Sequence, residues 1–271
     1  MILDPVTQLP PGFWEQVRAG SLRLLALDYD GTLAPLRVDR NEAWPLPGVV
    51  PLLQAIAAAG GSEVAVFSGR PLRELIRFLG TPPIHLVGEH GWETRYPDGR
   101  MAQHPLQRGC EEALRDAIAA AETVGLAPFL ERKRTAVVLH TRGIPGPQAL
   151  EVERLCLLQW KKLAMEPHLR ISPVNGGLEL RAMGRDKGTA LRELLDNSDP
   201  GTFAVYIGDD STDEDAFREL RHRGLGIRIG PTEQPSLARG RIESCDAMKE
   251  FLQRWRAILD EGPADAVNRH E

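Results

Sequence analysis

Short apolar runs alternate with stretches of helical periodicity along most of the chain. In the first ninety residues the apolar runs predict strands at 23–27, 64–67 and 84–87, and helices at 49–59 and 71–79 lie between them. Apolar positions three and four residues apart are typical of helices, and short continuous apolar runs are typical of buried parallel strands. This order predicts a βαβαβ unit and therefore a parallel sheet.

The rhythm changes in the middle of the chain. A Tyr-Pro-Asp-Gly turn predicts a hairpin over 92–101. The block that follows predicts two helices, at 110–124 and 147–163, and three strands, at 135–140, 168–171 and 178–181. This mixture without regular alternation is typical of a small α+β domain.

The α/β alternation returns in the last third of the chain. Strands are predicted at 203–207 and 225–229, and helices at 187–195, 212–220 and 246–259. The fold class expected is therefore α/β, a doubly wound parallel-sheet core with an inserted α+β cap. We expect the core to comprise residues 1–104 and 184–271 and the cap to comprise residues 105–183.

Composition and charge exclude several classes of partner. The chain has 271 residues, of which 42% are hydrophobic, and 33 Lys and Arg against 38 Asp and Glu give a net charge of −5. No positive field favours nucleic acid or an anionic membrane. Three widely spaced cysteines form no CxxC pair, and the N-terminal segment lacks a basic and apolar leader. We expect a cytoplasmic monomer whose partner is a small molecule, not nucleic acid or a membrane.

A first acidic motif, DYDGT at 28–32, directly follows the strand predicted at 23–27. Open α/β sheets bind ligands at the carboxyl ends of their strands. Asp28 and Asp30 point the same way on an extended segment, so they repel each other unless a cation or a shared proton intervenes. Gly31 permits a tight turn, and Thr32 offers a hydroxyl. Bound Mg²⁺ would resolve the repulsion, although a strand-end Asx turn explains any single aspartate.

A second acidic motif, GDDSTDED at 208–215, directly follows the strand predicted at 203–207. Mg²⁺ prefers a few carboxylate oxygens together with water and phosphate, and Asp28, Asp209 and one further acid would supply that set. Thr212 is predicted to cap the next helix, so Glu214 and Asp215 need be no more than charges at a helix start.

Two further signals lie at a strand end and a helix start. The segment FSGR at 67–70 closes the second strand, and a hydroxyl with free backbone N–H groups at a helix N-terminus can bind a phosphate. Lys187 opens the first helix after the insertion and offers a point charge for phosphoryl transfer. A lone lysine at a helix start is usually a solvated surface residue. The ordered set DxD, Ser, Lys and GDDxxD is far more specific than any of its members.

These motifs resemble the four motifs of the haloacid dehalogenase (HAD) superfamily of phosphohydrolases. Within it, the chain is similar to the trehalose-6-phosphate phosphatases over about residues 22–255. The segments that carry the closer resemblance are DYDGTL at 28–33, FSGR at 67–70, GEHG at 88–91, ERKRTAVVLHTR at 131–142, LELRAMGRDKGTA at 178–190 and GDDSTDE at 208–214.

The resemblance implies a phosphoric monoester hydrolase of trehalose biosynthesis that uses Mg²⁺ and an aspartyl-phosphate intermediate. It implies that Asp28 is the nucleophile, that Asp30 is the general acid and base, and that Lys187 completes the catalytic set. The implied metal ligands are Asp28, the backbone carbonyl of Asp30, and Asp209. Asp210 and Asp213 are also implied at the metal site, where each would bind the metal directly, orient its waters or orient Lys187. The implied phosphate-binding residues are Ser68, Gly69 and Lys187.

A disaccharide is neutral and rich in hydroxyls, so its pocket needs charged or bidentate hydrogen-bonding groups. The candidates for substrate binding are Arg70, His90, Glu131, Lys133, Arg142 and Glu179. Some of these residues fit a purely structural role equally well. His90 is compatible with a hydrogen-bonded turn, and the charge run at 131–134 is compatible with a solvated strand face.

Three other functions compete with this interpretation. The nearest is a phosphatase of the same superfamily that acts on another sugar phosphate, such as sucrose phosphate or mannosyl-phosphoglycerate. A receiver-like signalling domain that keeps its phosphate is a second, but it has no use for a leaving-group acid such as Asp30 or for a cap. A non-catalytic HAD-like binding module is a third, and the completeness of all four motifs argues against it.

Overall fold

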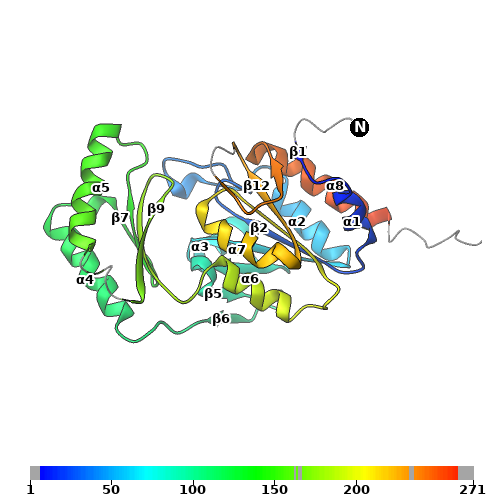
Figure 1. The fold of residues 1–271 in the computed structure, drawn as a ribbon, viewed down its shortest axis with the longest axis horizontal. Helices are drawn as coiled ribbons and strands as arrows, with labels where there is room; N and C mark the ends of the chain where they lie inside the picture. The colour runs from blue at the N-terminus through cyan, green and yellow to red at the C-terminus, as the bar shows by residue number, and fades with distance from the viewer. Residues whose placement is uncertain (1–6, 162, 164–166, 232–234, 262–271) are drawn as a thin grey trace, which may run out of the picture. The chain divides into compact units, whose positions relative to one another are not determined.

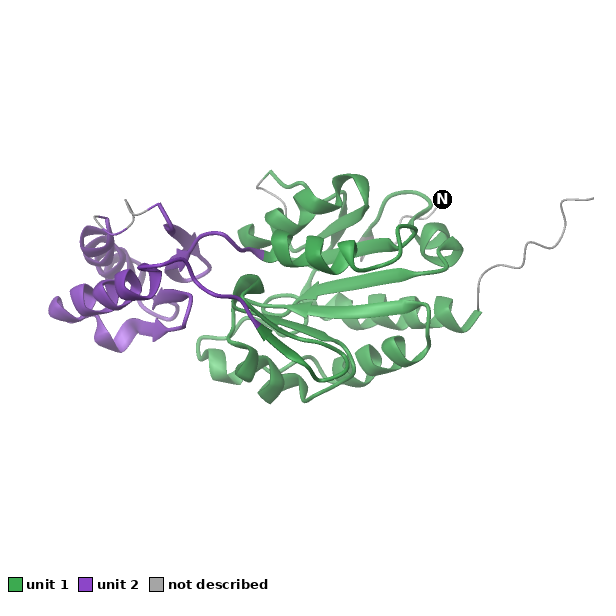
Figure 2. Ribbon diagram, turned by 90° about the horizontal axis from the view of Figure 1, so that it is seen from below, with its two compact units in different colours: residues 1–102, 187–271 green, residues 103–186 purple. Residues whose placement is uncertain are grey.

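The computed structural model describes residues 7–161, 163, 167–231 and 235–261. The chain divides into two compact units, which are coloured separately in Figure 2. The unit formed by Met1–Ala102 and Lys187–Glu271 is termed the core, and the unit formed by Gln103–Asp186 is termed the cap. The sequence pattern predicts the boundaries between core and cap after residues 104 and 183, whereas the compact units meet after residues 102 and 186.

The core is built on a nine-stranded sheet with the order β1-β13-β12-β11-β2-β3-β4-β5-β6 (Figure 1). The strands from β13 to β4 run parallel, whereas β1 and β5 are antiparallel to their neighbours β13 and β4. Their bounds are β1 Thr7–Gln8, β2 Arg23–Asp28, β3 Ser62–Phe67, β4 His85–Gly88, β5 Glu93–Arg95, β6 Met101–Gln103, β11 Phe203–Gly208, β12 Gly224–Ile229 and β13 Gly240–Ile242.

Helices cover both faces of this sheet. Leu25 and Leu27 of β2 pack into one apolar cluster with α1, α2, α3 and α8, whereas Leu24 and Ala26 pack into a second cluster with α6 and α7. The helices are α1 Phe13–Ala19, α2 Val49–Ala58, α3 Leu72–Leu79, α6 Lys187–Asp196, α7 Glu214–Glu219 and α8 Met248–Glu261. Because alternate residues of a strand face opposite sides, a strand buried on both sides is apolar throughout. The predicted doubly wound α/β class is confirmed.

Short 3₁₀ turns complete the core, namely η1 Arg40–Glu42, η2 Glu89–Gly91, η5 Ser211–Asp213, η6 Leu220–His222 and η7 Cys245–Ala247. The turn η5 corrects one prediction. Its N-cap is Asp210, whose carboxylate accepts a hydrogen bond of 2.6 Å from the Ser211 N–H, and Thr212 lies inside the turn. The expectation that Thr212 caps the helix was therefore wrong, because Asp210 precedes it and its carboxylate accepts from the first free N–H group.

The sequence pattern missed the short elements at the margins of the core sheet. In α1, Phe13 and Trp14 pack against Phe251 of α8, with ring centroids 6.0 and 5.0 Å apart. This helix has seven residues, of which two are buried, which is too short for a helical period to stand out. The strands β1 and β13 have two and three residues and carry no readable alternation.

The cap contains an antiparallel four-stranded sheet with the order β7-β8-β10-β9. Its strands are β7 Leu130–Arg132, β8 Ala136–His140, β9 Leu169–Val174 and β10 Gly177–Ala182, and its helices are α4 Cys110–Thr123 and α5 Gly146–Trp160, with the turn η3 Ala127–Phe129. The indole N–H of Trp160 donates to the Ala117 carbonyl at 3.0 Å and joins the two helices, which lie together on one side of the sheet in Figure 1.

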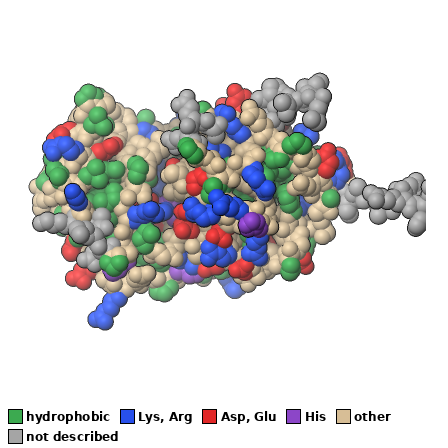
Figure 3. All heavy atoms as spheres, viewed as in Figure 1, with side chains coloured by type: hydrophobic (Ala, Val, Ile, Leu, Met, Phe, Trp, Pro, Cys, Tyr) green, Lys and Arg blue, Asp and Glu red, His purple; other side chains and the backbone are tan. Residues whose placement is uncertain are grey.

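The surface charge is mixed (Figure 3), and the cysteines are unpaired. Acidic and basic side chains are interspersed on the face shown in Figure 3. Cys110 and Cys156 are buried and Cys245 is half-buried, and all three are free thiols. No helix in the described ranges combines the length and the apolar character that crossing a membrane requires.

The strand order reverses direction at β2. From β2 the chain proceeds through β3 and β4 on one side, and after the cap it returns to β11 on the other side of β2. Such a reversal is where open α/β sheets bind their ligands, at the carboxyl ends of the strands. Asp28 ends β2, and Asp209 directly follows β11.

Candidate active site

Asp28 and Asp209 are brought together by the parallel pairing of β2 with β11. Leu27 is paired with Ile207, so the two strand ends meet at the same edge of the sheet. Gly31 makes the approach possible. Its φ is +86°, and a Cβ there would lie 2.1 Å from Asp209 Oδ2. Only glycine therefore allows the loop after β2 to pass beside the Asp209 carboxylate.

Lys187, the first residue of α6, joins two of the acids. Its Nζ lies 2.6 Å from Asp28 Oδ1 and 2.7 Å from Asp213 Oδ1, and all three side chains are buried. Asp213 Oδ1 also accepts a hydrogen bond from the Tyr206 hydroxyl at 2.7 Å, and its Oδ2 accepts from the Asp210 N–H at 2.9 Å. Both oxygens of Asp213 are thus committed to protein donors. The arrangement fixes Lys187 beside Asp28.

The acids of this cluster repel one another electrostatically. Burial raises the pKa of Asp28 well above its usual range; Lys187 partly offsets this, and Asp213 and Asp209 add to it. Burial would lower the pKa of Lys187, but the Asp213 and Asp28 carboxylates outweigh it and raise that pKa. Burial raises the pKa of Asp209 to about 8, with further contributions from Asp213 and Asp210. One lysine therefore does not neutralise this cluster.

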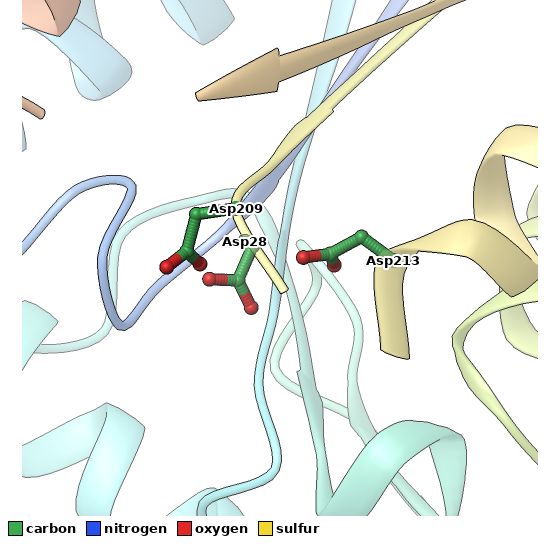
Figure 4. A group of neighbouring side chains, drawn as sticks. All are labelled: Asp28, Asp209 and Asp213. Carbon is green, nitrogen blue, oxygen red and sulfur yellow. The ribbon is translucent and has the colours of Figure 1, made fainter. Parts of the chain in front are cut away.

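The same acids fit a divalent cation. One carboxylate oxygen from each of Asp28, Asp209 and Asp213 lies within 4.8 Å of the others. In Figure 4 the Asp28 side chain lies between the other two, and the Asp213 carboxylate is directed toward it. Asp209 Oδ1 is buried, and no donor in the described part of the chain hydrogen-bonds to it. Oxygen donors suit Mg²⁺, and a second positive charge would offset the excess negative charge. The residues present therefore fit the metal that the resemblance implies.

Ser68 and Gly69 form a loop after β3, beside this cluster. The Ser68 N–H donates to the Val87 carbonyl at 2.9 Å, and Ser68 Oγ lies 3.4 Å from Asp30 Oδ2. A Cβ at Gly69 would lie 2.6 Å from Nε2 of His90, so the imidazole rests against the glycine. The structure thus groups Ser68, Gly69, Asp30 and His90 in the core.

The Glu89–His90 segment, termed the strap, is hydrogen-bonded to the loop that carries Ser68. Glu89 and His90 both have positive φ, 46° and 56°, which side chains rarely adopt. The Glu89 N–H donates to the Arg70 carbonyl at 2.8 Å, and the His90 N–H donates to the Ser68 carbonyl at 3.0 Å. Two hydrogen bonds thus hold the strained backbone and fix the Ser68 loop in place.

Arg70 forms an ion pair with Asp30. Its side chain is 4% exposed, and Nη2 and Nε lie 2.6 and 2.8 Å from the two carboxylate oxygens of Asp30. Glu74 of α3 and the carbonyl of Arg40 accept further hydrogen bonds from the same guanidinium.

The cap candidates form a polar cluster of their own. Glu131, Val138 and Glu179 are paired in register across β7, β8 and β10, so they share one face of the cap sheet. Lys133 Nζ lies 3.3 Å from Glu179 Oε1, and both side chains are buried. Glu131 Oε2 lies 2.8 Å from His140 Nε2.

The remaining cap candidate lies apart from that pair of contacts. Arg142 donates to the Asn175 carbonyl at 2.6 Å, in the turn between β9 and β10. The charge run at 131–134 is only partly a solvated face, since the side chain of Arg132 is 57% exposed but that of Lys133 is 7% exposed.

Several contributors to the site leave no signal in the sequence. Tyr206 lies in an apolar strand and gave no signal beyond core packing, and His140 stood out only as part of a cap motif. Glu214 lies in the first turn of α7, as expected, and it also makes contacts outside that helix. Its carboxylate accepts hydrogen bonds from Arg228 at 3.1 Å, Ser236 Oγ at 2.6 Å and the Leu237 N–H at 2.8 Å, and it ties α7 to the segment before β13. Partners this distant in sequence leave no local pattern.

Known proteins with similar sequences and folds agree on one family. Residues 26–239 match the family model described as Trehalose-phosphatase. The trehalose-phosphate phosphatase of Mycobacterium bovis is 32% identical over 253 residues, an alignment covering 89% of this chain and 63% of that protein. The chain thus spans somewhat less than two thirds of the length of this relative.

Solved structures share the fold. The C-terminal domain of Candida albicans trehalose-6-phosphate phosphatase matches 95% of this chain and 99% of its own, with a TM-score of 0.79 and 19% identity. A haloacid dehalogenase-like hydrolase from B. subtilis matches 85% of this chain and 100% of its own, with a TM-score of 0.58 and 17% identity. At such identities the likeness shows the fold alone. From the family model and the sequence matches, the chain belongs to the trehalose-phosphatase family.

Proposed function

We propose that this protein hydrolyses trehalose 6-phosphate to trehalose and phosphate through an aspartyl-phosphate intermediate, with Mg²⁺ as cofactor, as a cytoplasmic monomer. The observation that carries the proposal is the buried contact of Lys187 with Asp28 at the point where the strand order reverses, with Asp209 at the adjacent strand end. A nucleophilic carboxylate, a fixed positive charge and a metal-binding acid are what phosphoryl transfer needs at one place.

In the first step, Asp28 attacks the phosphorus and forms the acyl phosphate while the bond to the sugar oxygen breaks. Asp30, two residues along the same loop, donates a proton to that oxygen. In the second step a water attacks the phosphorus of the intermediate, and Asp30 takes its proton, which releases phosphate and regenerates Asp28. Splitting one difficult displacement into two easier ones is the benefit of the covalent route.

The other core residues hold the phosphoryl group. Lys187, fixed by Asp213, would bind its oxygens, and Ser68 with Gly69 would donate hydrogen bonds from the adjacent loop. Asp28, Asp209 and the Asp30 carbonyl would hold Mg²⁺, which supplies positive charge to the phosphoryl oxygens and reduces their repulsion from the nucleophile. Asp213 serves Lys187 and Asp210 caps η5, so neither is needed as a direct ligand.

The polar face of the cap sheet supports a role in sugar recognition. Glu131, Lys133 and Glu179 share it with His140, and charged groups of this kind can hydrogen-bond to sugar hydroxyls. We assign the choice of sugar to this face and to Arg142, because the core residues deal with phosphate alone. Another sugar phosphate, such as sucrose phosphate or mannosyl-phosphoglycerate, is the alternative substrate.

Phosphate release from a panel of sugar phosphates tests the reaction. With Mg²⁺ we expect trehalose 6-phosphate to be hydrolysed with the highest kcat/KM, and excess EDTA to abolish turnover because Asp28 and Asp209 then repel each other and the phosphate. A higher kcat/KM for a different sugar phosphate would show that trehalose 6-phosphate is not the preferred substrate. Full activity in excess EDTA would show that the reaction does not require the metal.

Substitution of the two loop acids separates their roles. Asp28→Asn should lose essentially all kcat, because an amide cannot form the acyl phosphate. Asp30→Asn should slow breakdown of the phosphoenzyme, so that acid-quenched samples retain phosphate on the protein. Equal activity of Asp28→Asn and the unaltered protein would refute the assignment.

The sugar-recognition role is tested by comparing a sugar phosphate with a small aryl phosphate. Glu179→Gln or Arg142→Ala should lower kcat/KM for trehalose 6-phosphate about ten- to a hundredfold, since a hydrogen bond to a charged group is worth roughly 1.5–3 kcal/mol. The aryl phosphate, which lacks the sugar, should be hydrolysed as before. Glu112→Gln on the exposed side of α4 is the matched control. A parallel loss on both substrates would show that these residues support the fold instead.

A further inference from the structure

The guanidinium of Arg70 meets the Asp30 carboxylate through two parallel hydrogen bonds. Nη2 lies 2.6 Å from Oδ1 and Nε lies 2.8 Å from Oδ2. Such a bidentate pair fixes the plane of the carboxylate as well as its position. The Asp30 side chain is 31% exposed, whereas that of Arg70 is 4% exposed, so the carboxylate reaches solvent from a buried support.

Arg70 is itself held from several directions. Its Nη1 lies 3.3 Å from Glu74 Oε2, and its Nη2 donates to the Arg40 carbonyl at 2.9 Å. The guanidinium carbon lies 5.0 Å from the centroid of the Phe78 ring and 5.6 Å from that of Tyr29. A planar cation packed against two rings loses little freedom when it binds a carboxylate.

The contacts continue one layer outward. Arg40 Nη2 lies 2.7 Å from Glu74 Oε2, and each of these side chains is 22% exposed. Charges therefore alternate from Asp30 through Arg70 and Glu74 to Arg40. These residues come from the loop after β2, the loop after β3, α3 and η1. Four segments of the core are therefore connected through the contacts of Arg70.

These contacts leave Arg70 with little capacity for a substrate. Of the five N–H donors of a guanidinium, the one on Nε and the two on Nη2 are used by Asp30 and the Arg40 carbonyl, and one on Nη1 is used by Glu74. Turning toward a phosphate or a sugar would leave Asp30 without its support and the buried cation without its main partner, which is costly.

We infer that Arg70 is a positioning residue that acts through Asp30, in place of the direct substrate contact that the sequence resemblance implies. The inference rests on the proposed function, in which Asp30 gives a proton to the leaving sugar oxygen and later takes one from the attacking water. Arg70 holds that carboxylate in one orientation for both transfers. Glu74 and Arg40 act one step further out by holding Arg70.

A double-mutant cycle tests the inference. Arg70→Gln should lower kcat for trehalose 6-phosphate about a hundredfold with KM unchanged, the loss typical of a misplaced catalytic group. In an Asp30→Asn background the same substitution should have no further effect, because residues that act as one unit are not additive. Arg70→Lys should recover only part of kcat, since an ammonium cannot reproduce the bidentate fork.

An aryl phosphate gives a second readout. Its leaving group needs no proton, so Arg70→Gln should keep the initial burst of phenol release while slowing the steady state, and the same is expected of Asp30→Asn. Arg73→Gln, an exposed arginine on α3, is the matched control and should match the unaltered protein. Thermal unfolding of each variant identifies loss of fold, and if Arg70→Gln does not fold, Arg70→Lys takes its place in the cycle.

Two results would overturn the inference. A raised KM at unchanged kcat would make Arg70 a substrate ligand, and losses that multiply in the double variant would show that Arg70 acts independently of Asp30. The proposed function fails separately. Absence of sugar phosphate hydrolysis by the unaltered protein contradicts the substrate, and the cycle is then run on the aryl phosphate.

Discussion

Repulsion among closely spaced carboxylates is the constraint on which the rest of the site depends. Asp28, Asp209 and Asp213 have oxygens within 4.8 Å of one another, and Lys187 is the one cation paired with them in the described residues. Asp213 is stabilised by Tyr206 and the Asp210 N–H as well as by Lys187. Asp28 and Asp209 are left with excess negative charge, which a divalent cation would balance. This charge balance is what the proposed binding of a metal and a phosphate would require.

The surrounding elements act as supports for this charge balance. Gly31 lets the loop after β2 pass Asp209, the strained Glu89–His90 strap holds the Ser68 loop, and Arg70 holds Asp30. Each support keeps a reacting or binding group in place before substrate arrives, which avoids reorganisation during the reaction. Under the proposed function, the core deals with the phosphate, and the paired charges of the cap sheet recognise the sugar.

The parts of the site that local sequence encodes were predictable. Asp28, Ser68 and Asp209 follow apolar strands, and parallel strands end at one edge, so their proximity could be foreseen. Lys187 was found because its motif falls at a helix start. The contacts of Glu214 and the pairing of Arg70 with Asp30 were not predictable, because the partners lie far apart in the sequence. The contact of Tyr206 was not predictable either, because its hydroxyl belongs to a residue of an otherwise apolar strand. The contacts of Asp210 and Asp213 also depend on side-chain geometry that no spacing reveals.

Calorimetric titration of the purified protein with MgCl₂ tests the charge balance most directly, because it needs neither substrate nor turnover. The structure predicts one Mg²⁺ per chain, binding abolished in Asp209→Asn, and binding retained in Tyr206→Phe, whose hydroxyl serves Asp213 and not the metal. Failure of the unaltered protein to bind Mg²⁺, or undiminished binding by Asp209→Asn, would contradict the account.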